Sequence, residues 1–319
     1  MREVSKKEIE EVILKNYIEY QYLFVEFQSK FLSSLHSRYQ SVENGNLVLY
    51  FAKQTHQDIL RQKDYDLNYD ISYEKFWENH RKISPKRRSL VKVVEDTLLA
   101  KETARRKILE LIKQKVLNKK NRNIIWSPSE DYKQSYNLFV NEEINDVCKL
   151  INYISEKLNL PVSTKEATKE LKEKFSFYWF HYLRTQLEYL KLWNKLFKDS
   201  ELILIFLHVV HLFASKAKEK NMTHKDIYND PSLLKEFIET SISATSISEV
   251  TKIPRATCVR KLESLVKFKL ISQDRITKRY YIISSAIADN LISKKITEKV
   301  VKLFSEFFFI CLRTINAKT

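Results

Sequence analysis

The feature that most constrains this 319-residue chain is a repeat of its own sequence. The segment 103–117 aligns with the segment 257–271 at an offset of 154, with one threonine, one arginine and three lysines identical and the apolar helix positions preserved. Two more apolar blocks follow in the same order: 47–51 with 203–207 at an offset of 156, and 147–151 with 300–304 at an offset of 153. Chance apolar matches would not keep one register over most of the chain. The sequence therefore predicts a pseudo-dimer built from two copies.

Residues that break helices are scarce, because the chain has one glycine and five prolines. Leu, Lys, Glu and Ile fill the helical windows, so we expect a mainly α fold. A single glycine excludes phosphate-binding loops and a Rossmann turn, and no GxSxG, HExxH or paired catalytic carboxylates are found. We do not expect an enzyme.

The chain carries 56 Lys and Arg against 40 Asp and Glu, a net charge of +16, which suits a polyanionic partner. Lysine is abundant along the whole chain, so the position of the cations is more informative than their number.

The cysteines Cys148, Cys258 and Cys311 form no CxxC pair, so neither a metal nor a disulfide framework is expected. No cofactor is predicted either. The N-terminus lacks signal-peptide features, and the longest apolar run, 202–213, is interrupted by two histidines and is too short to span a bilayer. We expect a soluble cytoplasmic protein with no membrane contact.

Both copies are predicted to follow one plan, in which long helices precede a helix-turn-helix, a hairpin and a last helix. In the first copy the expected segments are helices over 17–39, 47–60 and 73–80, a helix-turn-helix over 89–117 and a last helix over 141–158. In the second copy they are helices over 175–197, 201–217 and 231–239, a helix-turn-helix over 246–270 and a last helix over 286–315. The polar cluster 41–46 around Gly45 is expected to separate the first two helices, and Ser84-Pro85 to end a helix before the basic run 86–88.

The best linker is 159–164, where Pro161 follows a helix stop and Ser163 and Thr164 offer a new cap. This predicts two domains, 1–160 and 161–319. The last helix of each copy either packs on its own domain or joins the long first helices in an interface between copies or between subunits of a homodimer.

Residues 246–283 carry the clearest motif. A short helix over 246–250 and a turn at Lys252-Ile253 lead to Pro254, expected at the first position of the next helix. In that helix we expect Cys258, Leu262 and Leu265 in the core. The outward positions near its start, the part of a recognition helix that enters a major groove, are Arg255, Ala256, Val259 and Arg260. Residues 272–283 are predicted to form two short strands around a charged tip, a wing.

The pattern IPRATxxRKLxxLxxxxLI resembles the winged-helix domains of bacterial transcriptional regulators. The long flanking helices give a layout similar to MarR-type regulators, which are single-copy chains that dimerise. One position departs from that family, because Lys269, like Lys115 in the first copy, stands where a glycine is usual before the second strand. The resemblance implies sequence-specific binding of double-stranded DNA, with the recognition helix on base edges and the wing on the backbone or minor groove.

The first copy lacks the proline, and its wing, 118–126, is shorter but more basic. Arginine pairs with guanine edges, whereas lysine and wing cations mostly neutralise phosphates. The predicted DNA-binding residues are Arg255, Ala256, Thr257, Val259, Arg260, Lys261, Arg275, Lys278 and Arg279 in the second copy, and Lys101, Thr103, Arg105, Arg106, Lys107, Lys119, Lys120 and Arg122 in the first.

Two other sets of residues are assigned to the core. His208 and His211 have a spacing that suits a metal, but no third ligand is evident, so we expect a packing or hydrogen-bonding role. The aromatic residues Phe175, Phe177, Tyr178, Trp179, Phe180 and Tyr182 are expected in the core or at a dimer seam rather than around a ligand.

The favoured function is a transcriptional regulator whose tandem winged helices bind duplex DNA as a pseudo-dimer. One alternative is a replication initiator, because plasmid initiators of the Rep type also carry two winged helices in one basic chain. Another is a scaffold that uses its winged helices to bind proteins. The sequence identifies neither a target site nor a small-molecule effector.

Overall fold

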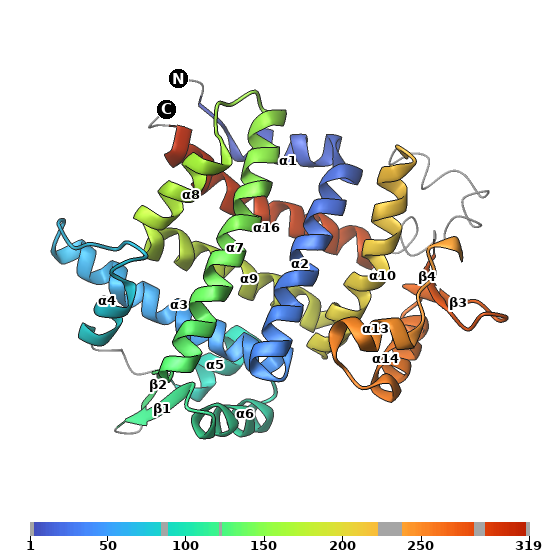
Figure 1. The fold of residues 1–319 in the computed structure, drawn as a ribbon, viewed down its shortest axis with the longest axis horizontal. Coiled ribbons are helices and arrows are strands. Elements are labelled where there is room, and N and C mark those ends of the chain that lie inside the picture. Colours follow the sequence, from blue (N-terminus) through green and yellow to red (C-terminus); the bar gives the residue numbers. More distant parts are fainter. Residues whose placement is uncertain (1–2, 84–88, 121–122, 223–237, 284–290, 317–319) are drawn as a thin grey trace.

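The structure is a computed structural model that describes residues 3–83, 89–120, 123–222, 238–283 and 291–316. These residues are mainly helical and include two small antiparallel sheets, which confirms the predicted fold class at this level (Figure 1). The helices of the first half are α1 (Lys6–Lys15), α2 (Tyr17–Tyr39), α3 (Val42–Tyr65), α4 (Phe76–Lys82), α5 (Leu90–Thr97), α6 (Lys101–Lys113) and α7 (Glu130–Lys157). Those of the second half are α8 (Thr164–Glu173), α9 (Phe175–Phe197), α10 (Ser200–Glu219), α13 (Ala244–Thr251), α14 (Arg255–Lys267) and α16 (Leu291–Asn316). The strands are β1 (Leu117–Lys120), β2 (Asn123–Trp126), β3 (Ile271–Gln273) and β4 (Tyr280–Ile282).

The second half repeats the order of these elements. Helices α1, α2 and α3 begin 158 residues before α8, α9 and α10, while α5, α6 and β1 begin 154 residues before α13, α14 and β3. Left-handed backbone conformations, which are uncommon outside glycine, recur at the same offsets. The equivalent left-handed residues of the two copies are Gln40 and Lys198, Leu98 and Lys252, and Lys115 and Lys269.

For the block 47–51, the alignment of the two copies by sequence differs from their alignment by helix starts. The sequence match places Leu47 opposite Ile203, but the starts of α3 and α10 place it opposite Ile205. Both helices carry a run of aliphatic residues here, so the sequences look alike at either register. The helix caps, Ser41 on α3 and Asp199 on α10, fix the offset at 158.

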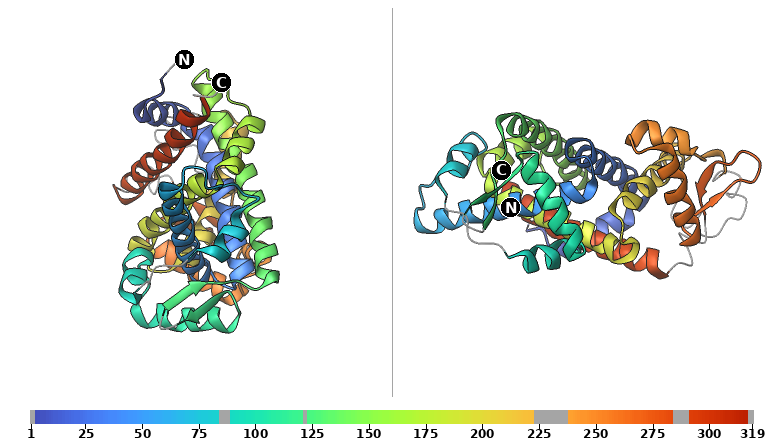
Figure 2. Two further views of the ribbon diagram at one scale, coloured as in Figure 1. Left: turned by 90° about the vertical axis from the view of Figure 1, so that its left-hand side faces the viewer. Right: turned by 90° about the horizontal axis from the view of Figure 1, so that it is seen from below.

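The two copies interleave rather than pack separately. Helix α2 lies along α10, α3 along α9, α1 against α16, and α7 against α8, so each pair joins one copy to the other (Figures 1 and 2). Their buried hydrophobic residues form one continuous core. The last helices combine the two alternatives considered, since α7 packs on α2 of its own copy and on α8 of the other, and α16 packs on α9 of its own copy and on α1 of the other. The chain passes between copies at the predicted linker, where α7 ends at Lys157 and Ser163 forms a capping box with Glu166 at the start of α8.

The polar cluster around Gly45 is not a break between helices, as the sequence suggested, but the first turn and a half of α3. Ser41 caps the helix by accepting a hydrogen bond from the Asn44 backbone N–H at 3.1 Å. A Cβ added to Gly45 would lie 2.8 Å from the Cβ of Leu35 on α2. The glycine thus permits close approach of α2 and α3 instead of ending a helix.

We expect Gly45→Ala to destabilise the protein by up to about 2 kcal/mol. Overpacking costs about 1–3 kcal/mol, and the gain of ~1 kcal/mol in helix propensity offsets only part of it. Urea unfolding followed by circular dichroism measures the change in the free energy of unfolding. A variant as stable as the wild type, or more so, would show that α2 and α3 have room for the methyl group.

Other predicted bounds shift at helix ends. The helix expected over 73–80 is α4 (Phe76–Lys82), and that expected from residue 141 begins at Glu130. Helix α13 begins at Ala244 because Ser243 caps it, and Pro254 is the N-cap of α14 rather than its first residue. Three predicted segments lie partly or wholly outside the described residues: the stop and basic run at 84–88, the helix at 231–239, and the start of the last helix at 286–290.

Candidate nucleic-acid interface

Each copy contains a helix–helix–hairpin unit: α5, α6 and β1–β2 in the first, and α13, α14 and β3–β4 in the second. The first helix of each unit is capped by a serine, Ser89 or Ser243, whose hydroxyl accepts a backbone N–H. It ends at a left-handed residue, Leu98 with φ 55° or Lys252 with φ 60°, which turns the chain toward the second helix. Both units thus build the same turn from different sequences.

Lys115 and Lys269, where the sequence resemblance led us to expect a glycine, adopt the backbone conformation that glycine favours. Lys115 has φ 59° and Lys269 has φ 56°, both in the left-handed region. In each unit this residue follows the second helix and leads into the first strand of the hairpin. The departure at this position changes the residue type but not the turn.

The inner face of each second helix is apolar, as predicted for α14. Cys258, Leu262 and Leu265 are fully buried. The corresponding buried residues of α6 are Ala104, Ile108 and Leu111.

The outer face of α14 carries much of the predicted DNA-binding set. Arg255, Ala256 and Arg260 are exposed, whereas Thr257 and Val259 are half-buried. The Arg255 Nε donates to the Thr245 hydroxyl of α13 at 3.1 Å, which holds this arginine near the start of the helix.

The outer face of α6 is also cationic. Lys101, Arg105 and Arg106 are exposed, and Thr103 is half-buried. Arg106 forms an ion pair with Glu110 at 2.6 Å, one turn along the same helix. Among the residues that the structure describes, no acidic group forms an ion pair with Arg260, its counterpart in α14.

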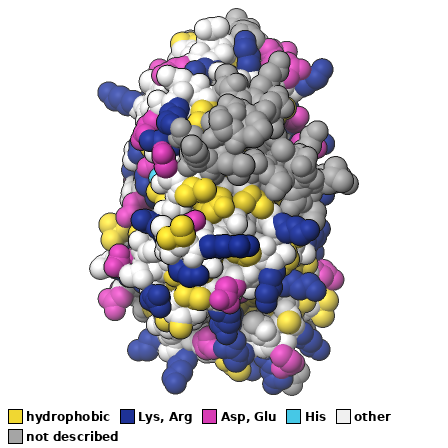
Figure 3. All heavy atoms as spheres, turned by 90° about the vertical axis from the view of Figure 1, so that its right-hand side faces the viewer, with side chains coloured by type: hydrophobic (Ala, Val, Ile, Leu, Met, Phe, Trp, Pro, Cys, Tyr) yellow, Lys and Arg dark blue, Asp and Glu magenta, His cyan; other side chains and the backbone are white. Residues whose placement is uncertain are grey.

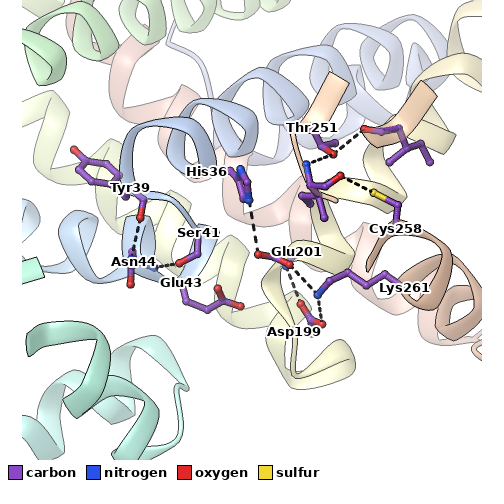
Figure 4. A network of polar contacts seen from close by, with 12 residues as sticks. His36, Tyr39, Ser41, Glu43, Asn44, Asp199, Glu201, Thr251, Cys258 and Lys261 are labelled. Carbon is purple, nitrogen blue, oxygen red and sulfur yellow. Dashed lines mark hydrogen bonds and ion pairs between the residues drawn. The ribbon is translucent and has the colours of Figure 1, made fainter. Parts of the chain in front are cut away.

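Two lysines predicted to contact DNA point inward. The side chain of Lys261 is 10% exposed, and its Nζ lies 2.6 Å from Asp199 Oδ2 and 3.0 Å from Glu201 Oε2 at the start of α10 (Figure 4). Burial opposes the charge of Lys261, but the two carboxylates outweigh it and raise its pKa. The prediction for this residue is wrong in its orientation, because the start of α10 provides two partly exposed carboxylates for it.

Lys107 is placed in the same way at the start of α3. Its side chain is 11% exposed, and its Nζ donates to Ser41 Oγ at 3.0 Å and to Asn44 Oδ1 at 3.4 Å, with Glu43 3.8 Å away. We call Lys107 and Lys261, with the helix starts that they bind, the lysine clamps. A sequence signal for them exists, since Lys261 falls on the same helical face as Cys258 and Leu265.

The hairpins carry the remaining predicted cations. In β3–β4, Ile271 pairs with Ile282 and Gln273 with Tyr280, and the tip between them exposes Arg275, Lys278 and Arg279. In β1–β2, Lys119 and Lys120 are exposed, and Arg122 lies outside the described residues.

A third stretch of backbone anchors the second hairpin. Ile242, just before α13, exchanges two backbone hydrogen bonds of 2.8 Å with Tyr280 of β4. The Tyr280 and Ile282 side chains are buried beneath the hairpin. The hairpin is therefore tied to both ends of the α13–α14 pair.

The two units are alike in charge and lie on one side of the molecule. Residues 101–120 contain eight Lys or Arg and two Glu, and residues 255–279 contain eight Lys or Arg with one Glu and one Asp, a net charge of +6 in each. Helices α6 and α14 both lie along the lower side in Figure 1, one in each half, and Figure 2 shows this side from below. Figure 3 faces the end with β3–β4 and shows Lys and Arg side chains gathered with hydrophobic ones between them.

The chain was compared with known families, curated proteins and solved structures. Nothing matches: no family model fits the chain, and no curated protein or solved structure is detectably similar to it.

The histidines of α10 pack against neighbouring side chains. His211 stacks on Tyr22 with ring centroids 5.6 Å apart, and burial lowers the pKa of His208 to about 4. Across the described ranges, no three His, Cys, Asp or Glu side chains are grouped to hold a metal ion. Of the six aromatic residues assigned to the core, Phe175, Tyr178, Trp179 and Tyr182 are buried, while Phe177 and Phe180 are half-buried.

Helix α10 has the length and composition to cross a membrane, the one such helix within the described part of the chain. However, 67% of its apolar window is buried inside the molecule, where it packs on α2, α9 and α14. Core helices of soluble proteins share this composition.

Proposed function

We propose that the chain is a DNA-binding transcriptional regulator in which the two helix–helix–hairpin units act as winged helices on double-stranded DNA. The observation that carries the proposal is that both units are strongly basic and lie on the same side of the molecule. Each has a net charge of +6, and the second helices of both lie on one side of an interleaved core. Phosphates are the polyanion that such a pair of basic units fits.

In this proposal the exposed N-terminal part of α14 enters a major groove. Arg260 and Arg255 reach base edges, where an arginine forms bidentate hydrogen bonds with guanine. The exposed cations of β3–β4 neutralise phosphates, which orients the unit without reading sequence. Helix α6 presents Arg105 and Arg106 to a second groove.

The fused copies let one chain bind an asymmetric site. Dimeric regulators place identical recognition helices about one DNA turn apart, ~34 Å, so their sites are palindromic. Here α6 and α14 differ at most exposed positions, and the interleaved helices fix their separation. We expect two unlike half-sites, with α14 as the principal reader because Glu110 partly neutralises Arg106 in α6.

We expect Arg260→Ala to weaken binding to a selected duplex about ten- to a hundredfold, since one arginine–guanine pair is worth ~1–3 kcal/mol. Arg106→Ala weakens binding less, because its ion pair with Glu110 already competes with DNA. Lys7→Ala is the matched control, a similarly exposed cation on α1. Fluorescence anisotropy over a range of salt concentrations measures the affinities, and binding must weaken as salt rises.

Three results would contradict parts of this proposal. No binding to duplex DNA at ~50 mM salt would refute it and favour a protein-binding scaffold. A symmetric footprint over a single half-site would refute the two-reader arrangement. Genomic selection that recovers only iterated repeats beside a replication origin would replace the regulator with an initiator.

A further inference from the structure

The tip of the β3–β4 hairpin combines one exposed apolar side chain with three cations. Ile276 is 91% exposed, the most exposed large hydrophobic residue of the described chain. Arg275, Lys278 and Arg279 surround it in sequence and are all exposed. A β-branched side chain held in water at this position forms no contact that stabilises the fold.

The tip is rigid. The Asp274 carboxylate accepts hydrogen bonds from the Thr277 backbone N–H at 2.6 Å and from the Thr277 hydroxyl at 2.7 Å. The backbone of Asp274 also bonds to Arg279 at 2.8 Å and to Lys278 at 3.0 Å. Ile276 therefore stands on an ordered turn, so little conformational entropy is lost when it is buried by a partner.

The hairpin presents this tip away from the body of the molecule. In Figure 1 the β3–β4 hairpin projects from the right-hand end, beyond α13 and α14. Its base is held by the Ile242–Tyr280 backbone pair. The tip thus projects from the end of the second unit, on a hairpin whose first strand packs on α14.

The cations and the isoleucine suit different parts of a DNA groove. The cations match phosphates, while Ile276 has no polar atom for a phosphate or a base edge. An apolar side chain in the minor groove acts by inserting between base pairs and partly unstacking them. A single apolar residue is too small to hold the protein on a lipid surface, where binding scales with the buried apolar area.

We propose that Ile276 is a wedge that enters the minor groove, partly unstacks one base step and bends the duplex bound by the second unit. This inference rests on the proposed DNA-binding function and adds a specificity-determining residue to it. Flexible pyrimidine–purine steps unstack most easily, so the wedge favours TA or CA/TG at its contact without a hydrogen bond to any base.

The test uses the full chain and a duplex enriched by the wild type from a random-sequence pool. Donor and acceptor dyes at the duplex ends report bending, and 2-aminopurine placed at successive steps reports unstacking. The variants are Ile276→Ala, Ile276→Leu as the conservative replacement, and Leu67→Ala as a control at another exposed apolar residue, 81% exposed on the chain between α3 and α4.

We expect wild type, Ile276→Leu and Leu67→Ala to bend the duplex and to brighten 2-aminopurine at one step, and Ile276→Ala to lose both signals. The affinity of Ile276→Ala falls less than about tenfold, because burial of the side chain and the cost of unstacking nearly offset each other. Bending by Ile276→Ala equal to that of the wild type overturns the wedge, as does a wild type that binds the duplex without bending it. A wild type that binds no duplex removes the proposed function itself.

Discussion

Lys261→Met is expected to destabilise the protein by about 2–4 kcal/mol, since it removes the only cation that bonds two carboxylates at the start of α10 within the described structure. Loss of one partner from a largely buried ion pair costs about 3–5 kcal/mol, and the partial exposure of Asp199, 34%, reduces that figure. Without Lys261, Asp199 and Glu201 keep only the α10 N-terminus and the His36 ring, whose Nε2 lies 3.8 Å from Glu201 Oε1, to offset their charges. The free energy of unfolding in urea measures the loss.

Lys107→Met is the matched control in the other copy. Its partners at hydrogen-bond distance are the neutral Ser41 and Asn44, and Glu43 lies farther away, at 3.8 Å. A hydrogen bond that involves a charged group contributes about 1.5–3 kcal/mol, less than the ~3–5 kcal/mol for a broken buried ion pair, so this variant should lose less stability than Lys261→Met. Equal losses for the two variants would contradict the assignment of the larger cost to the paired carboxylates.

Variants at and beside the lysine clamp of α14 distinguish an effect on folding from an effect on the proposed DNA binding. If Lys261 supports the fold, Lys261→Met weakens DNA binding only under conditions in which it also unfolds the second unit. Arg260→Ala, one residue away but exposed, should weaken binding without changing the free energy of unfolding. A Lys261→Met protein that is fully stable yet fails to bind DNA would indicate that Lys261 contacts DNA directly.

The sequence predicts the long helices well where apolar spacing and caps agree. The bounds of α2 and α9 match the predicted ranges at both ends. The start of α3 is missed because a lone glycine among polar residues resembles a helix break, with an intrinsic helix cost of ~1 kcal/mol. The glycine lies inside α3 because Leu35 of α2 packs closely against it. Local residue spacing does not predict such a tertiary contact.

For the candidate interface the sequence predicts which elements carry cations, but not which way every cation points. Arg260 and Lys261 are adjacent in sequence, yet one is exposed and the other buried. The difference comes from Asp199, which is 62 residues away in the chain and meets Lys261 only after α10 packs on α14. The interleaving of the copies also depends on contacts between residues far apart in the chain, so the sequence does not predict it. A duplicated sequence is equally compatible with two separate domains and with helices exchanged between copies.

A buried carboxylic acid joins the two copies near the middle of the molecule. Glu143 of α7 is 3% exposed and accepts a hydrogen bond from the hydroxyl of Tyr182 on α9. Burial raises the pKa of Glu143 to about 8, and the Tyr182 hydrogen bond offsets only part of that rise. At neutral pH the acid is mostly protonated in the folded protein and ionised in the unfolded chain.

We therefore expect the protein to lose stability as pH rises from 6.5 to 8, by about 2 kcal/mol at ~1.4 kcal/mol per pH unit. The loss due to Glu143 begins above its unfolded pKa of 4.5 and continues to its folded pKa of about 8. Below 6.5 it is masked, because burial lowers the pKa of His56 and His208 and their protonation destabilises the fold in acid. Urea unfolding at a series of pH values measures the slope.

Glu143→Gln should flatten the curve between pH 6.5 and 8, since glutamine keeps an acceptor for Tyr182 and cannot ionise. Glu142→Gln is the control, an exposed carboxylate next to it on α7 that should leave the slope intact. A slope that persists in Glu143→Gln would assign the pH dependence to other groups. Because Glu143 and Tyr182 belong to different copies, ionisation of this acid weakens the interface that sets the spacing of α6 and α14. Alkaline pH should therefore weaken the proposed DNA binding in the wild type before it does so in Glu143→Gln.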